Sequence, residues 1–551
     1  MGAEEEELER CIRRVLDSPS PRKLVVAGPG TGKTTLFKEL LNGCGGEPDH
    51  RLVLTFINSL RDDLELSLTG LAQVRTLHAY CMGLLHSKAE LRAGLTSDFR
   101  CVPGLAHLIG KDWEHIENEN EDDVPRFVRQ MRNLDEDSDI DFYLSRGDYY
   151  DAVDFDDCVF RAYRRLAANS DEVDAYELLL VDEYQDFNAL EAGLIGLLAK
   201  RSPILIAGDD DQALYSRLRD SKWDYIRALR QEGAFTVFDL PFCMRCPKVI
   251  VDAVNDVLTR AKERANLAGR IEKPYKHFPP AKGADSEKYP TIALVFTSVQ
   301  RANANYMGKY IADLISRIPP DEVDAATDGN YPALLVIVAK PYRTQIVDYL
   351  EEQGYRVETK TDVGRQILRE HGLAILKEDP RANVGWRIVL ESEPRALTAP
   401  LIRNSEHRDR PLDEIVTAPV RERILAEVDR WQPVPEPAED SEVTALEEEH
   451  RQPVVRVTSF EGAKGLSAQH VVIAGLHNGE IPHDPANIDD IEICRFLVGL
   501  TRTRKRCYLL HTGQFAQNQK SPSIFLSWIA PERYERIRVD ANYWKKMGKS
   551  G

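Results

Sequence analysis

The sequence predicts an α/β protein with two cores, each built on a parallel β-sheet flanked by helices. Two observations predict this class: short apolar runs alternate with helical sequence, and the runs fall into an early and a late set. The chain has 551 residues, of which 42% are hydrophobic and 29% are charged. That composition is ordinary for a globular protein, and the length is sufficient for several domains.

The early apolar runs predict the strands of the first core. Apolar residues at consecutive positions suit a strand that is buried on both faces, as in a parallel sheet. The runs are KLVVA at 23–27, RLVLTF at 51–56, LLLV at 178–181 and SPILIAGD at 202–209. The region from His86 to about Asp151 is polar with helical patches, and FDDCVFRAYRRLA at 155–167 is helix-like.

The late apolar runs predict the strands of the second core. They are TIALVF at 291–296, ALLVIVAK at 333–340, VVRVTSF at 454–460, HVVIAGL at 470–476 and RCYLLHT at 506–512. A proline- and acid-rich stretch precedes Val454 and predicts a linker or the edge of an insertion.

The net charge and the cysteine content limit which partners and which cellular compartment are expected. The net charge is -18, with much of the acid in blocks and a basic run, TRTRKR, at 501–506. An acidic total disfavours nucleic-acid binding only mildly, because local patches decide it. The nine cysteines are scattered, and Cys243 and Cys246 form a lone C-x-x-C without a second pair at zinc spacing, which indicates free buried thiols in a reducing compartment. With no signal peptide and no apolar run long enough to span a bilayer, we expect a cytoplasmic protein, nucleoid-associated at most, with no membrane partner.

The stretch AGPGTGKTT at 27–35 predicts a phosphate-binding loop. It follows a predicted strand and opens a helix, so its glycines can turn backbone N–H groups inward around phosphates. In such a loop Lys33 reaches the β- and γ-phosphates and Thr34 is a ligand of Mg²⁺. Ala27 stands where the strict pattern has glycine. The alternative is a glycine-rich turn that holds no nucleotide, which the GKTT sequence disfavours.

The stretch VDEYQDFN at 181–188 ends a buried strand in two carboxylates, Asp182 and Glu183. Buried carboxylates are costly unless something compensates their charge. After a phosphate-binding loop, such a pair predicts a hydrolytic metal site: Asp182 holds Mg²⁺ through water, and Glu183 orients and deprotonates the attacking water. The alternative is a solvated acidic turn.

Together with further segments in the same order, these two motifs resemble superfamily 1A helicases of the UvrD, Rep and PcrA kind over most of the chain. The further segments are LTFINSLRDDL at 54–64, TLHAYC at 76–81, DFDD at 154–157, GDDDQALY at 208–215, LPFCMR at 240–245, SFEGAKGL at 459–466, GLHNGEIPH at 475–483 and VGLTRTRKRCYL at 498–509.

The resemblance implies two RecA-like P-loop motor domains with small, mainly helical inserted subdomains. Domain 1A would comprise 1–84 and 150–239, and domain 2A would comprise 240–360 and 452–551. The inserted domains 1B, at 85–149, and 2B, at 361–451, would both be reduced in size. It further implies the cofactors ATP and Mg²⁺ and a track of single-stranded DNA, presented as a 3′-tailed duplex.

The resemblance also assigns roles to residues that match the family's motifs. The catalytic set is Lys33, Glu183, Gln212, Arg245 and Arg502. The nucleotide would be bound by Ala27, Gly28, Pro29, Gly30, Thr31, Gly32, Lys33, Thr34, Thr35, Gln185, Arg245, Gly465 and Arg502, and the metal by Thr34 and Asp182. DNA would be contacted by Phe56, Asn58, Thr76, His78, Tyr215 and Arg217, although Phe56 and Tyr215 equally suit core packing.

Several positions depart from the family pattern. Arg217 stands where a base-stacking aromatic residue is usual, and Met244 replaces the tyrosine that stacks on adenine. Glu461 and Ser467 replace a histidine and a glutamate, and the N-terminal glutamine that reads adenine is missing. We therefore expect loose selectivity for the nucleotide base.

Two functional hypotheses follow. The first is an ATP-dependent 3′–5′ single-stranded DNA translocase and helicase in DNA repair, recombination or anti-phage defence. The second is a nucleic-acid-sensing ATPase subunit that regulates a partner nuclease or other effector and unwinds little by itself; the reduced inserts and altered motifs favour it. A P-loop kinase or GTPase would not explain the later motifs.

Overall fold

The computed structural model describes residues 2–56, 58–92, 94–120, 124–135, 138–301, 304–359, 368–404, 410–432 and 453–546. Within these ranges the side chains of residues 58–60, 62, 63, 217, 301 and 304 lie outside the description.

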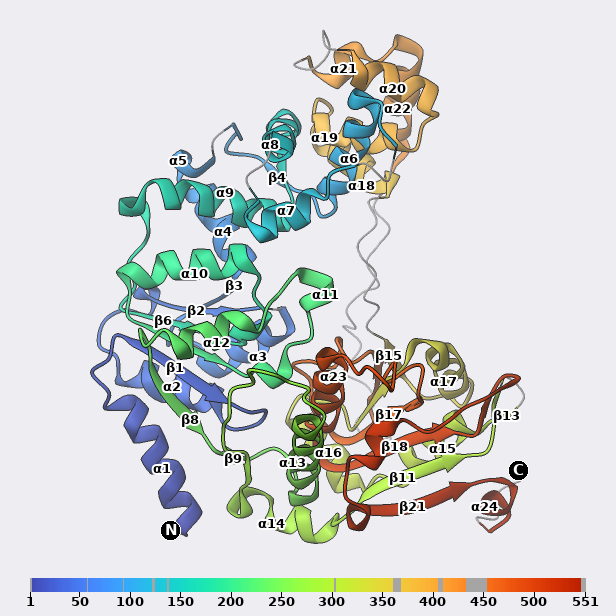
Figure 1. Ribbon diagram of the computed structural model, residues 1–551. Helices are drawn as coiled ribbons and strands as arrows, with labels where there is room; N and C mark the ends of the chain where they lie inside the picture. The colour runs from blue at the N-terminus through green and yellow to red at the C-terminus, as the bar shows by residue number, and fades with distance from the viewer. Residues whose placement is uncertain are drawn as a thin grey trace, which may run out of the picture.

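The first sheet has six parallel strands (Figure 1). Their order is β3 (Gln73–Thr76), β2 (Arg51–Thr55), β6 (Leu178–Val181), β7 (Ile204–Gly208), β1 (Arg22–Ala27) and β8 (Thr236–Leu240). The four inner strands are the four predicted from the sequence. The edge strands β3 and β8 are absent from that prediction because they are partly exposed and carry no continuous apolar run.

The second sheet has seven parallel strands. Their order is β15 (Val357–Thr359), β16 (Val455–Thr458), β14 (Leu334–Val338), β17 (Ala468–Ala474), β18 (Thr503–Thr512), β11 (Ile292–Thr297) and β21 (Tyr534–Val539). The five inner strands are again those predicted, and the two partly exposed edge strands are again missed. The two sheets confirm the predicted fold class.

Helices cover both faces of each sheet, and alternate strand residues serve the two faces. On the first sheet, Val25 and Val53 pack with α1 (Ala3–Leu16), α2 (Lys33–Gly43) and α3 (Asn58–Leu68), whereas Leu24 and Leu52 face α4 (Leu77–Ser87), α9 (Phe155–Ala168) and α10 (Ala189–Arg201). On the second, α13 (Lys248–Glu263) and α23 (Asp490–Leu500) cover one face, and α15 (Tyr306–Ile315), α16 (Pro320–Asp328), α17 (Lys340–Glu352) and α24 (Ala541–Lys546) cover the other.

Shorter elements complete the described chain. They are α5 (Ala89–Arg92), β4 (Arg100–Cys101), β5 (Ala152–Val153), η4 (Tyr184–Asp186), η5 (Asp210–Gln212), α11 (Ser216–Arg219), α12 (Asp224–Gln231), β9 (Phe242–Cys243), β10 (Lys276–His277), α14 (Pro279–Lys288), β12 (Gln300–Arg301), β13 (Ala304–Asn305), β19 (Gln514–Phe515) and β20 (Asn518–Gln519), with further 3-10 turns at 48–50, 170–172, 524–527 and 531–533. Within the described ranges, no helix combines the length and the apolar composition that crossing a bilayer requires.

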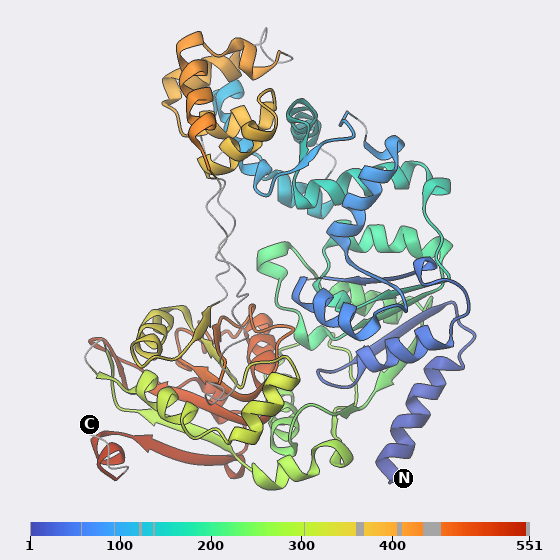
Figure 2. The same ribbon diagram turned by 180° about the vertical axis from the view of Figure 1, so that it is seen from behind.

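Two helical segments far apart in the sequence pack together above the first sheet (Figures 1 and 2). One segment contains α6 (Leu105–Glu117), α7 (Phe127–Asn133) and α8 (Ser138–Tyr150). The other, which we call the helical lobe, contains α18 (Arg369–Glu378), α19 (Asn383–Glu391), α20 (Arg395–Arg403), α21 (Leu412–Ile415) and α22 (Ala418–Arg430). A single hydrophobic core runs through both segments and joins them to the first sheet.

A buried ion-pair cluster fastens the helical lobe to α6. The carboxylate of Asp112 accepts hydrogen bonds from Arg146 Nε at 2.9 Å and from Arg387 Nε, in α19, at 2.7 Å. The Tyr150 hydroxyl donates to the same carboxylate. Asp112 and Arg387 are fully buried. Burial alone would raise the pKa of Asp112, but the two guanidinium groups hold it below its usual range.

We predict that Asp112→Ala destabilises the protein by about 3–5 kcal/mol, because it removes the buried carboxylate that two buried guanidinium groups share. Urea unfolding followed by tryptophan fluorescence measures the change. The control is Glu263→Ala, which breaks an exposed pair with Arg260 and should change stability by about 0.5 kcal/mol or less. Equal stability of Asp112→Ala and the wild type would show that the cluster does not hold the lobe.

Candidate nucleotide and nucleic-acid sites

The loop between β1 and α2 has the backbone geometry of an anion site. Gly30 and Gly32 have φ values of +72° and +91°, which glycine adopts without steric cost. No side chain caps α2, whose first turn begins at Lys33, so its N-terminal N–H groups are available to a ligand. The Thr31 hydroxyl donates to the Gly28 carbonyl at 2.9 Å and steadies the turn. These features suit a polyphosphate.

Two buried carboxylates at the end of β6 face this loop. Lys33 Nζ lies 2.8 Å from Glu183 Oε1 and 3.8 Å from Asp182 Oδ1. Burial raises the pKa of Asp182 to about 6 despite Lys33. Burial also raises the pKa of Glu183, but Lys33, Lys464 and a hydrogen bond from Gln185 lower it more, so Glu183 is ionised. Glu183 has φ +53°, a strained conformation of the kind that clusters at functional sites.

The residues beside Lys33 fit a magnesium ion. Thr34 supplies a hydroxyl in the first turn of α2, and Asp182 supplies a carboxylate at the adjoining strand end. Hydroxyl and carboxylate oxygens are the ligands that Mg²⁺ prefers. Of the other predicted loop residues, Ala27 ends β1 and Thr35 is exposed on α2.

Lys464, from the second sheet's connection after β16, completes the charge balance. Its ammonium group forms an ion pair with Asp186, lies 3.7 Å from Glu183 Oε2 and donates to the Gln212 carbonyl at 2.5 Å. Lys464 is absent from the predicted site, although it adjoins the predicted Gly465, which has φ +82° and forms the following turn. The basic residue in that segment is the signal that points to it, but local sequence does not reveal the contact with the other sheet.

A relay of hydrogen bonds joins Glu183 to Arg502 of the second sheet. Gln185 Nε2 donates to Glu183 Oε2 at 2.6 Å, and Gln185 Oε1 accepts from the Asp209 backbone N–H at 2.9 Å. Gln212 Nε2 then donates to Asp209 Oδ2 at 2.8 Å, while Gln212 Oε1 accepts from Arg502 Nη2 at 3.0 Å. The structure therefore brings the predicted Glu183, Gln185, Gln212 and Arg502 into one network.

Two arginines lie together where the sheets meet. Arg245 Nη1 donates to the Thr501 carbonyl at 3.4 Å, and its Cβ packs against Gly30 of the phosphate loop. Burial lowers the pKa of Arg502 to about 10, and the neighbouring charge of Arg245 adds to this effect. Neighbouring like charges repel, so an anion bound on the loop would be favoured by both arginines.

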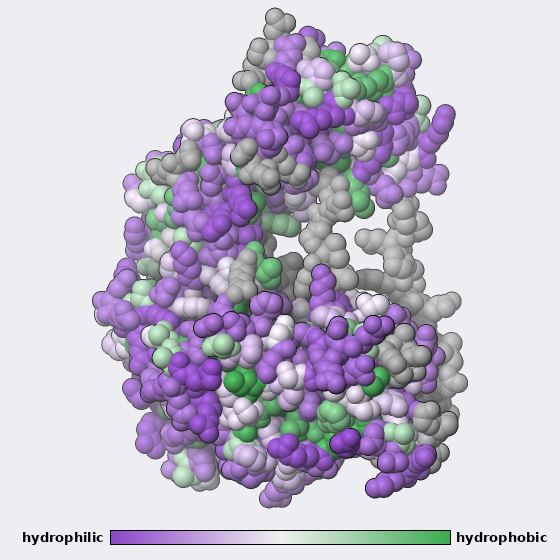
Figure 3. Space-filling view, turned by 45° about the vertical axis from the view of Figure 1, so that its right-hand side comes forward, coloured by the Kyte–Doolittle hydropathy of each residue, from purple (hydrophilic) through white to green (hydrophobic). Residues whose placement is uncertain are grey.

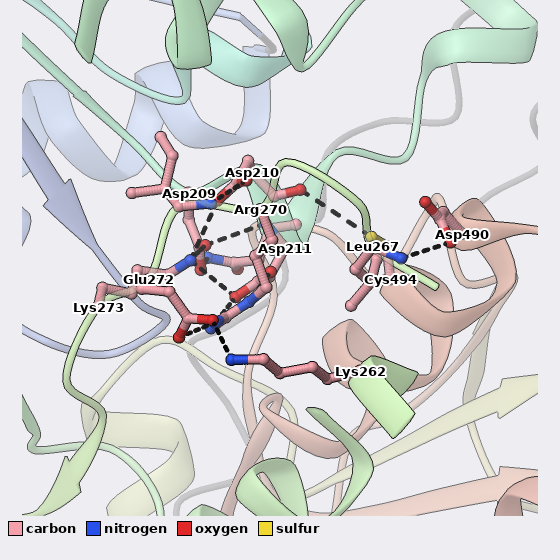
Figure 4. Close-up of polar contacts among 12 residues, drawn as sticks. Asp209, Asp210, Asp211, Lys262, Leu267, Arg270, Glu272, Lys273, Asp490 and Cys494 are labelled. Carbon is pink, nitrogen blue, oxygen red and sulfur yellow. Dashed lines mark hydrogen bonds and ion pairs between the residues drawn. The ribbon is translucent and has the colours of Figure 1, made fainter. Parts of the chain in front are cut away.

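Three consecutive aspartates, Asp209–Asp211, form a compact acidic cluster that Lys273 fills (Figure 4). Lys273 Nζ lies 2.7, 3.1 and 2.7 Å from the carboxylates of Asp209, Asp210 and Asp211. Arg227 also pairs with Asp210 and Arg270 with Asp211, so three cations match three anions. The cluster is an internal support for Gln212 rather than a metal centre.

The predicted DNA contacts Phe56, Thr76 and His78 line one cavity of about 440 Å³ on the first sheet. The Thr76 hydroxyl accepts from the Ala79 N–H at 3.2 Å and caps α4. Burial and the charge of Arg219 lower the pKa of His78 to about 4, so its ring is neutral at pH 7. The charged groups around the ring are those of Arg132, Asp156, Glu191 and Arg219.

Arg219, absent from the prediction, covers the ring that was expected to stack on a base. Its guanidinium group lies 4.6 Å from the centre of the Phe56 ring, and the Tyr215 ring lies 5.0 Å away. Phe56 is only 3% exposed, so a base would have to displace Arg219 to stack on it. The Tyr215 hydroxyl is directed to the second sheet and donates to the Glu461 carbonyl at 3.1 Å. The side chains of Asn58 and Arg217 lie outside the described residues.

A basic groove of about 690 Å³ adjoins this cavity between α6 and α7, and the two share Arg132. Its charged lining is Lys111, Arg126, Arg129, Arg132, Glu114 and Asp220, with His107 beside them. Four permanent cations against two carboxylates form a local basic patch on a chain whose net charge is -18. On the face that Figure 3 shows, hydrophilic residues predominate and hydrophobic ones occur in small groups.

Comparisons with known proteins give one family match and several relatives. The model of the AAA domain family matches residues 13–217. The chain is 28% identical over 231 residues to an ATP-dependent DNA helicase Rep from Buchnera aphidicola, covering 35% of this chain and 34% of the relative. It is 27% identical over 284 residues to the ATP-dependent DNA helicase PcrA of Staphylococcus aureus, covering 44% and 38%. These two matches thus span little more than a third of each relative. A PcrA from Staphylococcus epidermidis is 23% identical over 622 residues, covering 92% and 84%.

We predict that His78 makes the protein less stable in mild acid. The unfolded chain protonates this group near pH 6.5 but the folded chain only near pH 4, so its stabilising contribution is lost as pH falls between these values. The loss at pH 5 is about 2 kcal/mol. Urea unfolding at pH 7.5 and 5 should show a smaller decrease for His78→Gln than for the wild type. Exposed His50→Gln should retain the wild-type decrease, and an identical decrease in His78→Gln would contradict the prediction.

Proposed function

We propose that the chain is a superfamily 1A helicase of the UvrD, Rep and PcrA kind, and that it acts as an ATP-dependent 3′–5′ single-stranded DNA translocase and helicase. The carrying observation is that Lys464 and Arg502 of the second sheet reach Glu183 and Gln212 at the phosphate loop of the first. In this proposal the sheets belong to motor domains 1A and 2A, and the helices above them to 1B and 2B.

The hydrolysis roles follow from charge and position. Lys33 and the loop amides hold the phosphates of ATP, and Thr34 and Asp182 hold Mg²⁺, which would offset phosphate charge. Glu183, ionised and held by Lys33 and Gln185, suits the base that orients and deprotonates water. Arg245 and Arg502 stabilise charge on the transferring phosphoryl group.

Contacts across the seam between the sheets supply the coupling to movement. The γ-phosphate would lie beside Gln212 and Arg502, so its loss changes the balance of charge on both sides of the seam. Tyr215 and Glu461 form a second link between the sheets, next to the proposed DNA cavity. Opening and closing of the seam would then move the residues that contact a bound DNA strand.

The basic groove and the adjoining cavity support a nucleic-acid track. Single-stranded nucleic acid is bound by positive grooves that follow its backbone and by rings that stack on its bases. The groove offers Arg126 and Arg129, and the cavity offers Arg219 above Phe56. Because neither surface presents a rigid pattern of base-reading groups, sequence-independent binding is expected.

The second candidate is an ATPase subunit that senses nucleic acid and regulates a nuclease or other effector. The observation that favours it is the helical lobe, which shares its core with α6 and α8 through Trp386 and the Asp112 cluster. A lobe held in this way is not free to act as an independent element on duplex DNA. Repair, recombination and anti-phage defence are all compatible settings for either candidate.

The proposal is tested by steady-state ATP hydrolysis with and without single-stranded DNA, together with strand displacement on 3′-tailed and 5′-tailed duplexes. We expect DNA to stimulate hydrolysis and only the 3′-tailed duplex to be unwound. Glu183→Gln should lower kcat at least 100-fold, because it removes the proposed base. Stimulated hydrolysis without displacement would favour the sensing subunit, and hydrolysis that is indifferent to DNA would contradict both candidates.

We predict that the double variant Arg126→Glu with Arg129→Glu raises the Kd for single-stranded DNA at least tenfold in 100 mM salt. If both side chains contact phosphates, the slope of log affinity against log salt falls by roughly 1.4. Fluorescence anisotropy over a salt series measures both quantities. The matched control, Arg260→Glu with Lys262→Glu, reverses two exposed charges on α13 and should leave both unchanged. Equal effects in the two variants would contradict a track along the groove.

A further inference from the structure

Two thiols flank Arg245 in the turn between β9 and α13. Cys243 and Cys246 are both fully buried, and the Cys246 backbone N–H lies 3.4 Å from Cys243 Sγ. Nothing in the proposed hydrolysis uses either sulfur. The segment at 240–245, which resembles a motif of the helicase family, thus begins a C-x-x-C pair around Arg245, which is proposed to face the nucleotide.

Each thiol contacts a different side of the seam. Cys243 Sγ lies 3.4 Å from the position that a Cβ on Gly30 would take, so it packs on the phosphate loop. Cys246 Sγ lies 3.6 Å from the Thr501 carbonyl, which also accepts from Arg245 and directly precedes Arg502. The turn therefore connects the phosphate loop to both arginines.

The surroundings of Cys243 favour its reactive form. Burial raises the pKa of the thiol, but hydrogen bonds from Cys246, from the Tyr275 hydroxyl and from the backbone N–H groups of Cys246 and Arg245 lower it to about 6. The thiolate is the nucleophile in thiol oxidation. A small cavity of about 20 Å³ has room for a molecule about the size of water; its lining includes Tyr275, a partner of Cys243, and Thr501, a partner of Cys246, but neither cysteine itself.

We propose that Cys243 and Cys246 form a thiol-oxidation site, which a peroxide-class oxidant converts into a disulfide that stops ATP hydrolysis. This inference rests on the proposed ATPase function. It assigns to the turn between β9 and α13 a modification that is separate from nucleotide and DNA binding.

The chemistry balances with one peroxide per disulfide. The Cys243 thiolate attacks one peroxide oxygen, the O–O bond breaks, and the departing hydroxide takes up a proton and leaves as water. The Cys246 thiol then attacks the resulting sulfenic acid, the S–S bond forms, the S–O bond breaks, and a second water leaves. Two thiols are oxidised and one peroxide is reduced to two waters.

The disulfide would change the position of Arg245. Disulfide formation removes the hydrogen of the Cys246 thiol, so its sulfur can no longer bond to the Thr501 carbonyl, which lies 3.6 Å away. Arg245, between the two cysteines, bonds to that same carbonyl. Closing the bridge therefore shifts the one arginine that packs on Gly30, and the nucleotide loses its stabilising charge.

The test treats the full chain with hydrogen peroxide, removes the oxidant with catalase, and measures DNA-stimulated hydrolysis and the disulfide by peptide mass mapping. We expect a Cys243–Cys246 disulfide, at least a tenfold loss of hydrolysis, and recovery with dithiothreitol. Cys243→Ser should retain more than half of its hydrolysis after treatment. Cys101→Ser, which removes the exposed thiol, should respond as the wild type does.

Several outcomes would overturn the site: no such disulfide in the treated wild type, a disulfide that leaves hydrolysis within twofold, or equal inactivation of Cys243→Ser. Should Cys243→Ser fail to fold, the mapped disulfide and its reversal in the wild type decide the matter. Absence of hydrolysis in the reduced protein would instead contradict the proposed function. The site is then judged by whether the mapped disulfide weakens binding of a fluorescent ATP analogue at least tenfold.

Discussion

The need to compensate buried carboxylates at the end of β6 organises this protein. Asp182, Glu183 and Asp186 are each 8% exposed or less, and burial disfavours their charged forms. Lys33, on the same sheet, compensates two of them, but Asp186 and the second oxygen of Glu183 turn to Lys464 of the other sheet. An unpaired buried charge is costly, so these ion pairs fix the position of one sheet relative to the other. The carboxylates involved include Glu183, which is also the proposed catalytic base.

Gln212 is also held in position by a series of buried polar contacts. Gln212 can face Arg502 only while Asp209 orients its amide, and Asp209 is itself held by Lys273. Lys273 lies in the segment after α13, which also bonds through the Leu267 N–H to Asp490 of α23 at 2.8 Å. The contacts that hold Gln212 in place therefore involve elements of both sheets. A change in the separation of the sheets would move Gln212 relative to the phosphate loop.

What the sequence can predict depends on whether the signal is local. Eight of the nine inner strands contain at least three consecutive apolar residues, the exception being β16, and all nine are predicted, whereas β3, β8, β15 and β21 are half-exposed edges with no such run. The phosphate loop and the pair Asp182 and Glu183 can likewise be predicted, because each is a short sequence motif that directly follows a strand. The roles of Lys464, Lys273 and Arg219 cannot be predicted in this way, because each depends on contact with a residue more than 60 positions away in the sequence.

The helical lobe shows how a buried charge can decide which parts of the chain move together. Although the lobe is inserted between β15 and β16 of the second sheet, its core contacts are with α6 and α8 above the first. Separating Arg387 from Asp112 would break a fully buried ion pair, whereas the exposed pairs elsewhere on the surface cost little to break. Movement of the second sheet is therefore expected to leave the lobe with the first.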